Sequence, residues 1–123
     1  MPFVHRERVR FRDVDSVGHV NNAVYLTYLE EARIAFLSQT DEDPLAMVVA
    51  RIEIDFRSPA ELDETVEVSV IPGGVGTTSF TLHHELRAGG RLVAEASTVL
   101  VAYDYSKNEP RAVPDAWRKL LGP

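Results

Sequence analysis

The sequence predicts an α+β fold in which one long helix packs against a curved, largely antiparallel sheet. Three observations predict it. Residues 22–39 repeat apolar side chains at three- and four-residue steps, the period of a helix with one buried face. Most later segments alternate apolar and polar side chains, as half-buried strands do. The turns between these segments are short, so the last four strands are expected to be mostly antiparallel neighbours.

The bulk composition narrows the class of protein. The 123 residues suit one domain with a real core, and we expect a single domain over residues 1–123. No apolar run approaches the roughly 18 residues of a membrane span, and the first residues lack the apolar centre of a secretory signal. The absence of cysteine fits a cytoplasmic protein and excludes a thiolate nucleophile. A net charge of −6 without a basic block argues against nucleic-acid binding.

The first elements follow from periodicity. Residues 4–12 predict a strand with Val9 and Phe11 on one face and the arginines of this segment on the other. Gly18 interrupts the chain before the helix, which is expected from Asn22 to about Gln39. Glu30, Glu31 and Arg33 fall outside the apolar face of this helix. That face is formed by Tyr25, Tyr28, Leu29, Ala32 and Phe36.

Four strands are expected next, in VVARIEIDFRSP, TVEVSVI, TTSFTLHHELR and RLVAEASTVLVAYDY. PGGVG and AGG are expected as turns, and VPDAWRKLLG as a short terminal helix. His83 and His84 are adjacent, so in a strand they point to opposite faces and cannot both bind one metal ion. The last long strand is apolar on both faces. Such a strand in a small domain predicts a homo-oligomer, a homodimer or a homotetramer.

The segment RFRDVDSVGHVNNAVYLTYLEEAR, residues 10–33, crowds polar turn-forming residues just ahead of the helix. Asp, Asn, Ser and Gly form turns and caps, so Asn21 or Asn22 can simply cap the helix. The same residues also suit catalysis. A helix N-terminus offers unpaired N–H groups to an oxyanion, and an upstream carboxylate can act as nucleophile or general base. Residue types alone leave both interpretations open.

This stretch closely resembles the opening motif of hotdog-fold acyl-CoA thioesterases of the 4-hydroxybenzoyl-CoA thioesterase type. Members share an aspartate, a glycine three residues on, a GHVNN-like turn, and a helix with Tyr and EAR. The likeness extends along nearly the whole chain, including VVARIEIDFRSPAELDETVEV, the GTTSF strand and the closing VP. The resemblance implies a hotdog fold, in which the sheet wraps the long helix. It also implies hydrolysis of an acyl-CoA to free acid and CoA, with no cofactor and no metal ion.

The resemblance also implies roles for single residues. Asp15 matches the catalytic carboxylate, as nucleophile or general base. Asn22, seven residues later, matches the helix-start position whose backbone N–H polarises the thioester carbonyl, and Gly18 would allow close backbone approach. A similar HVNN turn in plant acyl-carrier-protein thioesterases places Asn and His in the chemistry. His19 and the Asn21 side chain are therefore further candidates, with a turn-stabilising hydrogen bond as the alternative for His19.

Other residues receive weaker assignments. Asp13 is expected to accept an N–H and hold the loop. Arg57 faces solvent by default, but it can also meet a CoA phosphate or a partner subunit. The region of Thr77 and Ser79 lies near the pantetheine or phosphate end of CoA in relatives. Together with Tyr25, these three residues are the candidates for substrate binding.

Two other functions stay open beside the acyl-CoA thioesterase. An acyl-carrier-protein thioesterase would need a basic docking patch, which the acidic composition disfavours. A non-catalytic acyl-CoA-binding hotdog module would keep the pocket and lack turnover. If the hotdog expectation failed, a cystatin-like helix and curved sheet would be the next fold. The identity and length of the acyl group depend on packing and on the partner subunit.

Overall fold

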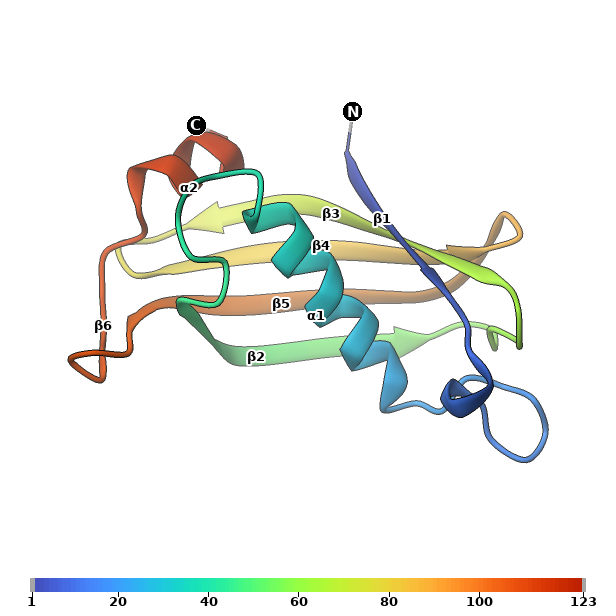
Figure 1. Cartoon of the computed structure of the whole chain (residues 1–123). Helices are drawn as coiled ribbons and strands as arrows, with labels where there is room; N and C mark the ends of the chain where they lie inside the picture. Colours follow the sequence, from blue (N-terminus) through green and yellow to red (C-terminus); the bar gives the residue numbers. More distant parts are fainter. Residues whose placement is uncertain (1, 123) are drawn as a thin grey trace.

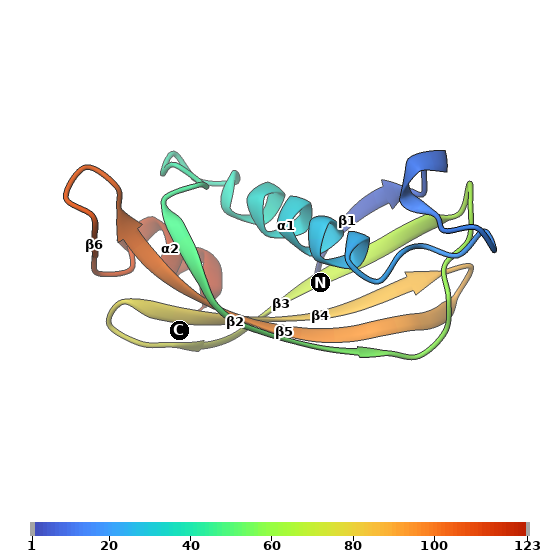
Figure 2. The same cartoon turned by 90° about the horizontal axis from the view of Figure 1, so that it is seen from below.

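The computed structural model describes residues 2–122 as one antiparallel sheet that curves around a long helix (Figure 1). Figure 2 shows the helix α1 lying in the hollow of the sheet. The strands are β1 (Phe3–Arg8), β2 (Met47–Phe56), β3 (Thr65–Val75), β4 (Ser79–Ala88), β5 (Arg91–Asp104) and the short β6 (Glu109–Pro110). The helices are α1 (Val24–Leu37), α2 (Asp115–Leu121) and the 3-10 turn η1 (Phe11–Asp13). The predicted α+β hotdog arrangement is confirmed.

The strands follow the order β1-β3-β4-β5-β2, and all these pairs are antiparallel. The prediction that the later strands pair as consecutive neighbours is right for β3, β4 and β5. It is wrong for β2, which pairs with β5 at the far edge, so residues 57–64 must cross to β3. This crossover puts β2 at an edge of the sheet, and the end of β2 lies beside the start of α1 (Figure 1).

The predicted strand at residues 4–12 is shorter than expected. β1 ends at Arg8, where the Val9 N–H donates to the Glu64 carbonyl and the chain turns into η1. Val9 is fully buried whereas Phe11 is 83% exposed, so the two side chains do not share a face. The strand prediction fails after Arg8 because η1 is not extended, so its successive side chains do not alternate between two faces.

The core lies between α1 and the concave face of the sheet. The five predicted core residues of α1 are all buried. The predicted apolar faces of β3 and β4 are buried as well: Val66, Val68, Val70, Phe80, Leu82, His84 and Leu86. Arg33 was expected outside this face and is instead buried, because it lies one helical turn from both Leu29 and Leu37, which are fully buried. Burial of these apolar side chains is the main favourable term in folding.

Of the two turns predicted between strands, one is confirmed and one is not. PGGVG is not a turn: β3 runs on to Val75 with a register shift, and the chain reverses only after it. Gly73 permits this, since a Cβ there would lie 2.8 Å from the His83 ring. The AGG turn is confirmed, with Gly89 and Gly90 at φ of 58° and 79°. No helix within residues 2–122 has the length and apolarity needed to cross a membrane.

Candidate functional site

One pocket of about 300 Å³ lies at the N-terminal end of α1. Five of the candidates from the sequence line it: Asp15, His19, Asn22, Tyr25 and Arg57. The remaining lining residues are Val20, Phe56, Ser58 and Pro59. The pocket therefore forms where the polar loop before α1 meets the end of β2, two segments that are far apart in the sequence.

The loop over residues 13–21 is closed by its own backbone. The Asp15 N–H donates to the His19 carbonyl at 2.8 Å, and the Asn21 N–H donates to the Asp13 carbonyl at 2.9 Å. Gly18 sits at the tip with φ of 82°, a left-handed conformation that favours glycine. A Cβ at this position would meet no atom within 4 Å, so backbone conformation and not space requires the glycine.

The turn orients the carboxylate of Asp15 through hydrogen bonds to only one of its two oxygens. Its Oδ1 accepts the N–H groups of Val17 at 2.9 Å and His19 at 3.2 Å. Its Oδ2 has no hydrogen bond to any residue that the structure describes, and the side chain is exposed. Asp15 therefore serves as a turn residue and still presents one free carboxylate oxygen at the pocket.

Asp13 has a different environment two residues earlier. It is buried, and its Oδ2 accepts the Arg10 N–H at 2.9 Å and the Tyr28 hydroxyl at 2.8 Å. Burial raises the pKa of Asp13, but these hydrogen bonds and the Arg10 charge outweigh it and leave the pKa below its usual value. Burial and the bond to Asp13 raise the pKa of Tyr28. Asp13 thus holds the loop by accepting N–H and O–H groups, as expected from the sequence.

At the start of α1 the two asparagines differ. The Asn21 Oδ1 accepts the Ala23 N–H at 2.9 Å, which is the Asx-turn geometry of a cap. The Asn22 N–H finds no acceptor within the described part of the chain, and Asn22 lines the pocket. The His19 imidazole also lacks a hydrogen bond there. It is the His19 backbone that stabilises the turn, and it also bridges to Glu61.

Tyr25 links the helix to the opposite wall. Its hydroxyl accepts the Ala60 N–H at 3.1 Å, and its ring lies 5.5 Å from the Phe56 ring. Burial raises the pKa of the Tyr25 hydroxyl. The Val20 N–H donates to the Ala60 carbonyl at 2.9 Å, so the crossover after β2 is tied to both sides of the polar loop. Arg91 fixes the same crossover by donating to the Pro59 carbonyl at 2.8 Å.

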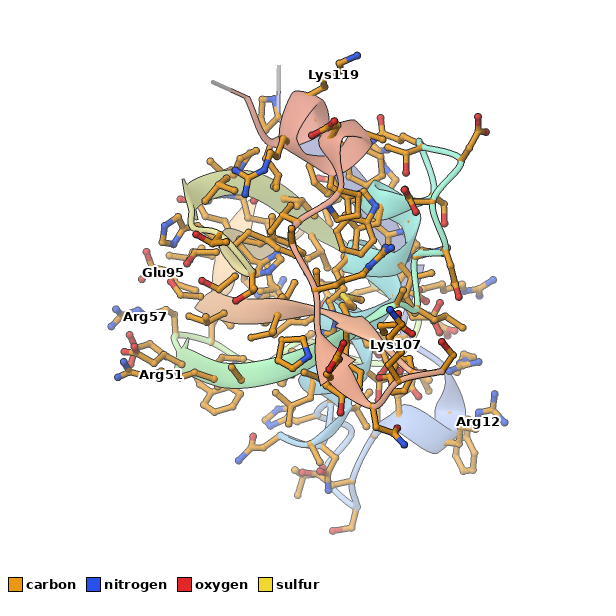
Figure 3. The ribbon with its side chains drawn as sticks, turned by 90° about the vertical axis from the view of Figure 1, so that its left-hand side faces the viewer. Arg12, Arg51, Arg57, Glu95, Lys107 and Lys119 are labelled. Atoms are coloured by element: carbon orange, nitrogen blue, oxygen red, sulfur yellow. The ribbon has the colours of Figure 1, made fainter. Side chains whose placement is uncertain are left out.

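The other substrate-binding candidates lie less centrally. Arg57 lines the pocket, but its guanidinium pairs with Glu95 at 2.9 Å. Figure 3 shows Arg51, Arg57 and Glu95 together on one side of the molecule, with Arg12 on the opposite side. Thr77 and Ser79 lie at the turn between β3 and β4, and neither lines the pocket. One chain does not bring them together with Asp15.

Sequence reasoning missed part of the pocket wall. Phe56, Ser58 and Pro59 line it because β2 ends beside α1. The one signal for this was the RSP sequence that ends the strand, since proline stops a strand from continuing. Which loop that strand end would face depends on the pairing of β2 with β5, and local sequence does not show this pairing.

Comparisons with known proteins agree with this arrangement. The family described as the thioesterase-like superfamily matches residues 9–121. The long-chain acyl-CoA thioesterase FadM of Escherichia coli K12 is 32% identical over 93% of this chain and 92% of its own. The acyl-CoA thioester hydrolase YbgC of Escherichia coli O6:H1 is 30% identical, over 87% and 86%.

A solved structure is also similar. A thioesterase of Thermus thermophilus, complexed with coenzyme A and Zn, superposes with a TM-score of 0.88 at 38% identity, covering 98% of this chain and 97% of that one. This likeness spans the sheet, α1 and the polar loop alike, and the family match spans nearly the whole chain. The chain therefore belongs to the thioesterase-like superfamily.

Proposed function

We propose that this protein hydrolyses acyl-CoA thioesters, with Asp15 as nucleophile or general base and the Asn22 N–H as oxyanion donor. The observation that carries the proposal is the shared pocket, which is lined both by Asp15, whose carboxylate has a free oxygen, and by Asn22, whose N–H is unpaired in the described chain. The names of FadM and YbgC support acyl-CoA as the substrate class.

The chemistry follows from these two groups. As general base, the Asp15 carboxylate takes a proton from water while the water oxygen adds to the thioester carbonyl. As nucleophile, a carboxylate oxygen adds itself and forms a mixed anhydride, which water then cleaves. In both routes the carbonyl oxygen gains negative charge, which the Asn22 N–H and the positive end of α1 stabilise. The C–S bond then breaks, and the thiolate leaves and takes up a proton.

The first test is release of CoA thiol from a panel of short, long and aromatic acyl-CoAs, followed with a thiol-reactive dye. The protein contains no cysteine and adds no background thiol. Asp15→Asn is expected to lower turnover by roughly 10² to 10⁴ with an unchanged thermal midpoint. Asp41→Asn, an exposed carboxylate in the loop after α1, is the matched control. Full turnover by folded Asp15→Asn would refute the assignment of Asp15.

The routes differ in where oxygen from water goes. In a single turnover in heavy-oxygen water, label recovered in Asp15 would identify nucleophilic attack. Label confined to the product acid, with none in Asp15, is expected for the general-base route and excludes an anhydride that water opens at the Asp15 carboxyl carbon. Tight acyl-CoA binding without turnover across the panel would instead favour the non-catalytic binding module.

The proposal includes a homo-oligomer. β2 lies at the edge of the sheet, with Val49 and Phe56 more than 40% exposed, and such an edge favours association. Light scattering at micromolar concentration is expected to give at least the mass of a dimer. A monomeric mass would refute this part of the proposal.

A further inference from the structure

The oxyanion site proposed above has one donor, the Asn22 N–H. The carbonyl oxygen of a thioester has two lone pairs and can accept two hydrogen bonds. Oxyanion sites for acyl transfer commonly use two donors, such as the pair of backbone N–H groups in serine proteases of the chymotrypsin type. A second donor in the same pocket would therefore complete the site.

The pocket at the start of α1 has several side chains that can donate a hydrogen bond, and they differ in what they already bind. The Ser58 hydroxyl donates to a backbone carbonyl at 2.9 Å, and the Arg57 guanidinium is ion-paired. The side chains of His19 and Asn22 lie where water reaches them. Tyr25 is only 2% exposed, so water does not replace a partner that its hydroxyl lacks. The Tyr25 hydroxyl is therefore the donor to consider.

The Tyr25 hydroxyl is hydrogen-bonded only through its oxygen. That oxygen accepts the Ala60 N–H at 3.1 Å, and no acceptor for the hydroxyl hydrogen is found within residues 2–122. Glu64, whose charge reaches Tyr25, has both of its carboxylate oxygens bonded to Arg91. A buried tyrosine hydroxyl usually finds an acceptor. The hydrogen of this hydroxyl is therefore available to a bound molecule.

Tyr28, three residues further along α1, provides a comparison. Its ring centroid lies 6.1 Å from that of Tyr25, and it is equally buried. The Tyr28 hydroxyl, however, donates to Asp13 Oδ2 at 2.8 Å, and Tyr28 does not line the pocket. Of the two tyrosines, only Tyr25 combines a free hydroxyl hydrogen with a place in the pocket wall.

Two hydrogen bonds locate the Tyr25 hydroxyl at the pocket. The hydroxyl contacts the N–H of Ala60, which directly follows the lining residue Pro59. The Ala60 carbonyl accepts the N–H of Val20, a lining residue of the loop before α1, at 2.9 Å. A long helical side chain also leans towards the helix N-terminus, over the residue three positions earlier, which here is Asn22. Lining residues therefore flank the hydroxyl on both sides.

The surroundings of Tyr25 suit a donor that keeps its proton. Burial raises the pKa of the Tyr25 hydroxyl, so the hydroxyl is protonated at neutral pH. The N–H that Ala60 donates to the hydroxyl oxygen polarises the O–H bond and makes it a stronger donor. Such a hydroxyl stabilises a developing negative charge by hydrogen bonding, without a proton transfer.

We propose that the Tyr25 hydroxyl donates a hydrogen bond to the thioester carbonyl oxygen and forms a two-donor oxyanion site with the Asn22 N–H. The inference rests on the proposed thioesterase function and adds a catalytic residue to it. When an oxygen of water or of Asp15 adds to the carbonyl carbon, the π electron pair moves onto the carbonyl oxygen, and both hydrogen bonds strengthen. The pair returns when the C–S bond breaks and the thiolate leaves. Tyr25 keeps its proton throughout.

The first test removes only the hydroxyl. Tyr25→Phe keeps the ring that packs against Phe56. Butanoyl-CoA, dodecanoyl-CoA and benzoyl-CoA are the substrates, and the one that the wild type hydrolyses fastest is used for the comparison. We expect kcat to fall by about 10² to 10³, as for loss of one oxyanion donor. We expect KM to change by less than about threefold, because the bond gains strength mainly in the transition state.

Tyr28→Phe is the matched control, because it also removes a buried hydroxyl from α1. It leaves Asp13 bonded to the Arg10 N–H, which still holds the loop. We expect its thermal midpoint to fall at least as far as that of Tyr25→Phe, and its kcat to stay within about threefold of the wild type. Equal losses of kcat in the two variants would overturn the proposal, since loosening of α1 would then explain both.

Replacement of Tyr25 by 3,5-difluorotyrosine separates donation from packing. The fluorines lower the pKa of the phenol, and a phenolate has no hydrogen to donate. We expect kcat near that of the wild type at neutral pH and a fall in kcat at alkaline pH that the wild type shows only at higher pH. An alkaline pH profile identical to that of the wild type would overturn the proposal.

The remaining outcomes separate this inference from the function on which it rests. Full kcat in folded Tyr25→Phe, together with lost turnover in Asp15→Asn, would overturn the role of Tyr25 alone. Hydrolysis of no acyl-CoA by the wild type would overturn the thioesterase function as well.

Discussion

Two aspartates of the loop before α1 differ in how many of their carboxylate oxygens are engaged in hydrogen bonds. Asp13 is buried, and its acceptor oxygen is used by the Arg10 N–H and the Tyr28 hydroxyl. Asp15 is exposed and keeps one oxygen free. The same residue type, two positions apart, therefore holds the loop in one case and is available for chemistry in the other. Burial and not residue type separates the two roles.

The largest effect on stability is expected from Asp13→Ala. The change leaves the buried Tyr28 hydroxyl and the Arg10 N–H without their acceptor, which costs about 2–3 kcal/mol of unfolding free energy. Asp15→Ala loses only exposed turn hydrogen bonds and is expected to cost less than about 1 kcal/mol. Urea unfolding of both variants tests the comparison. Equal losses would show that the two aspartates do not divide their roles by burial.

A pH-dependent effect is expected from His84, the buried histidine beneath α1. Burial lowers its pKa from 6.5 to about 4, against the raising effect of its bond to the Ser69 carbonyl and with help from the charge of Arg33. The unfolded chain therefore binds the proton first, and stability falls as the pH drops from about 6.5 towards about 4.

Thermal midpoints across this pH range test the role of His84. His84→Gln is expected to flatten the dependence, since its side chain does not titrate. His83→Gln is the matched control on the exposed face of β4, and because the His83 charge makes the smallest contribution to the lowered pKa of His84, this variant is expected to keep most of the wild-type slope. An unchanged slope in His84→Gln would contradict the assignment of this pH dependence to the buried ring.

The smallest effect on the free energy of unfolding is expected from the asparagines just before α1. Asn21→Ala removes the side-chain acceptor of the Ala23 N–H and should cost about 0.5–1 kcal/mol. Asn22→Ala is the matched control, because the Asn22 side chain has no hydrogen bond in the described chain. This change is expected to alter the free energy of unfolding by less than about 0.5 kcal/mol. The same urea series measures both. The reverse order would identify Asn22 as the cap.

Much of the site could be predicted from the sequence because its residues lie close together along the chain. Asp15, His19, Asn22 and Tyr25 lie within eleven residues, and the motif that contains them forms one turn and one helix start. The opposite wall was not accessible. Phe56 and Pro59 reach the pocket only through the pairing of β2 with β5. Arg57 was a candidate because of its charge and its outward strand face, and neither of these indicates its contact with the pocket.

The sequence by itself determined the fold class, the buried face of α1, the alternation of β3 and β4, and the opposite orientation of His83 and His84. Each follows from a period of two or 3.6 residues, which is a property of neighbouring positions. Tertiary structure decided the place of β2 in the sheet, the exposure of Phe11 and the burial of Arg33. It also decided the bond between Tyr28 and Asp13. These features depend on contacts between distant segments, and packing at such contacts overrides the local pattern.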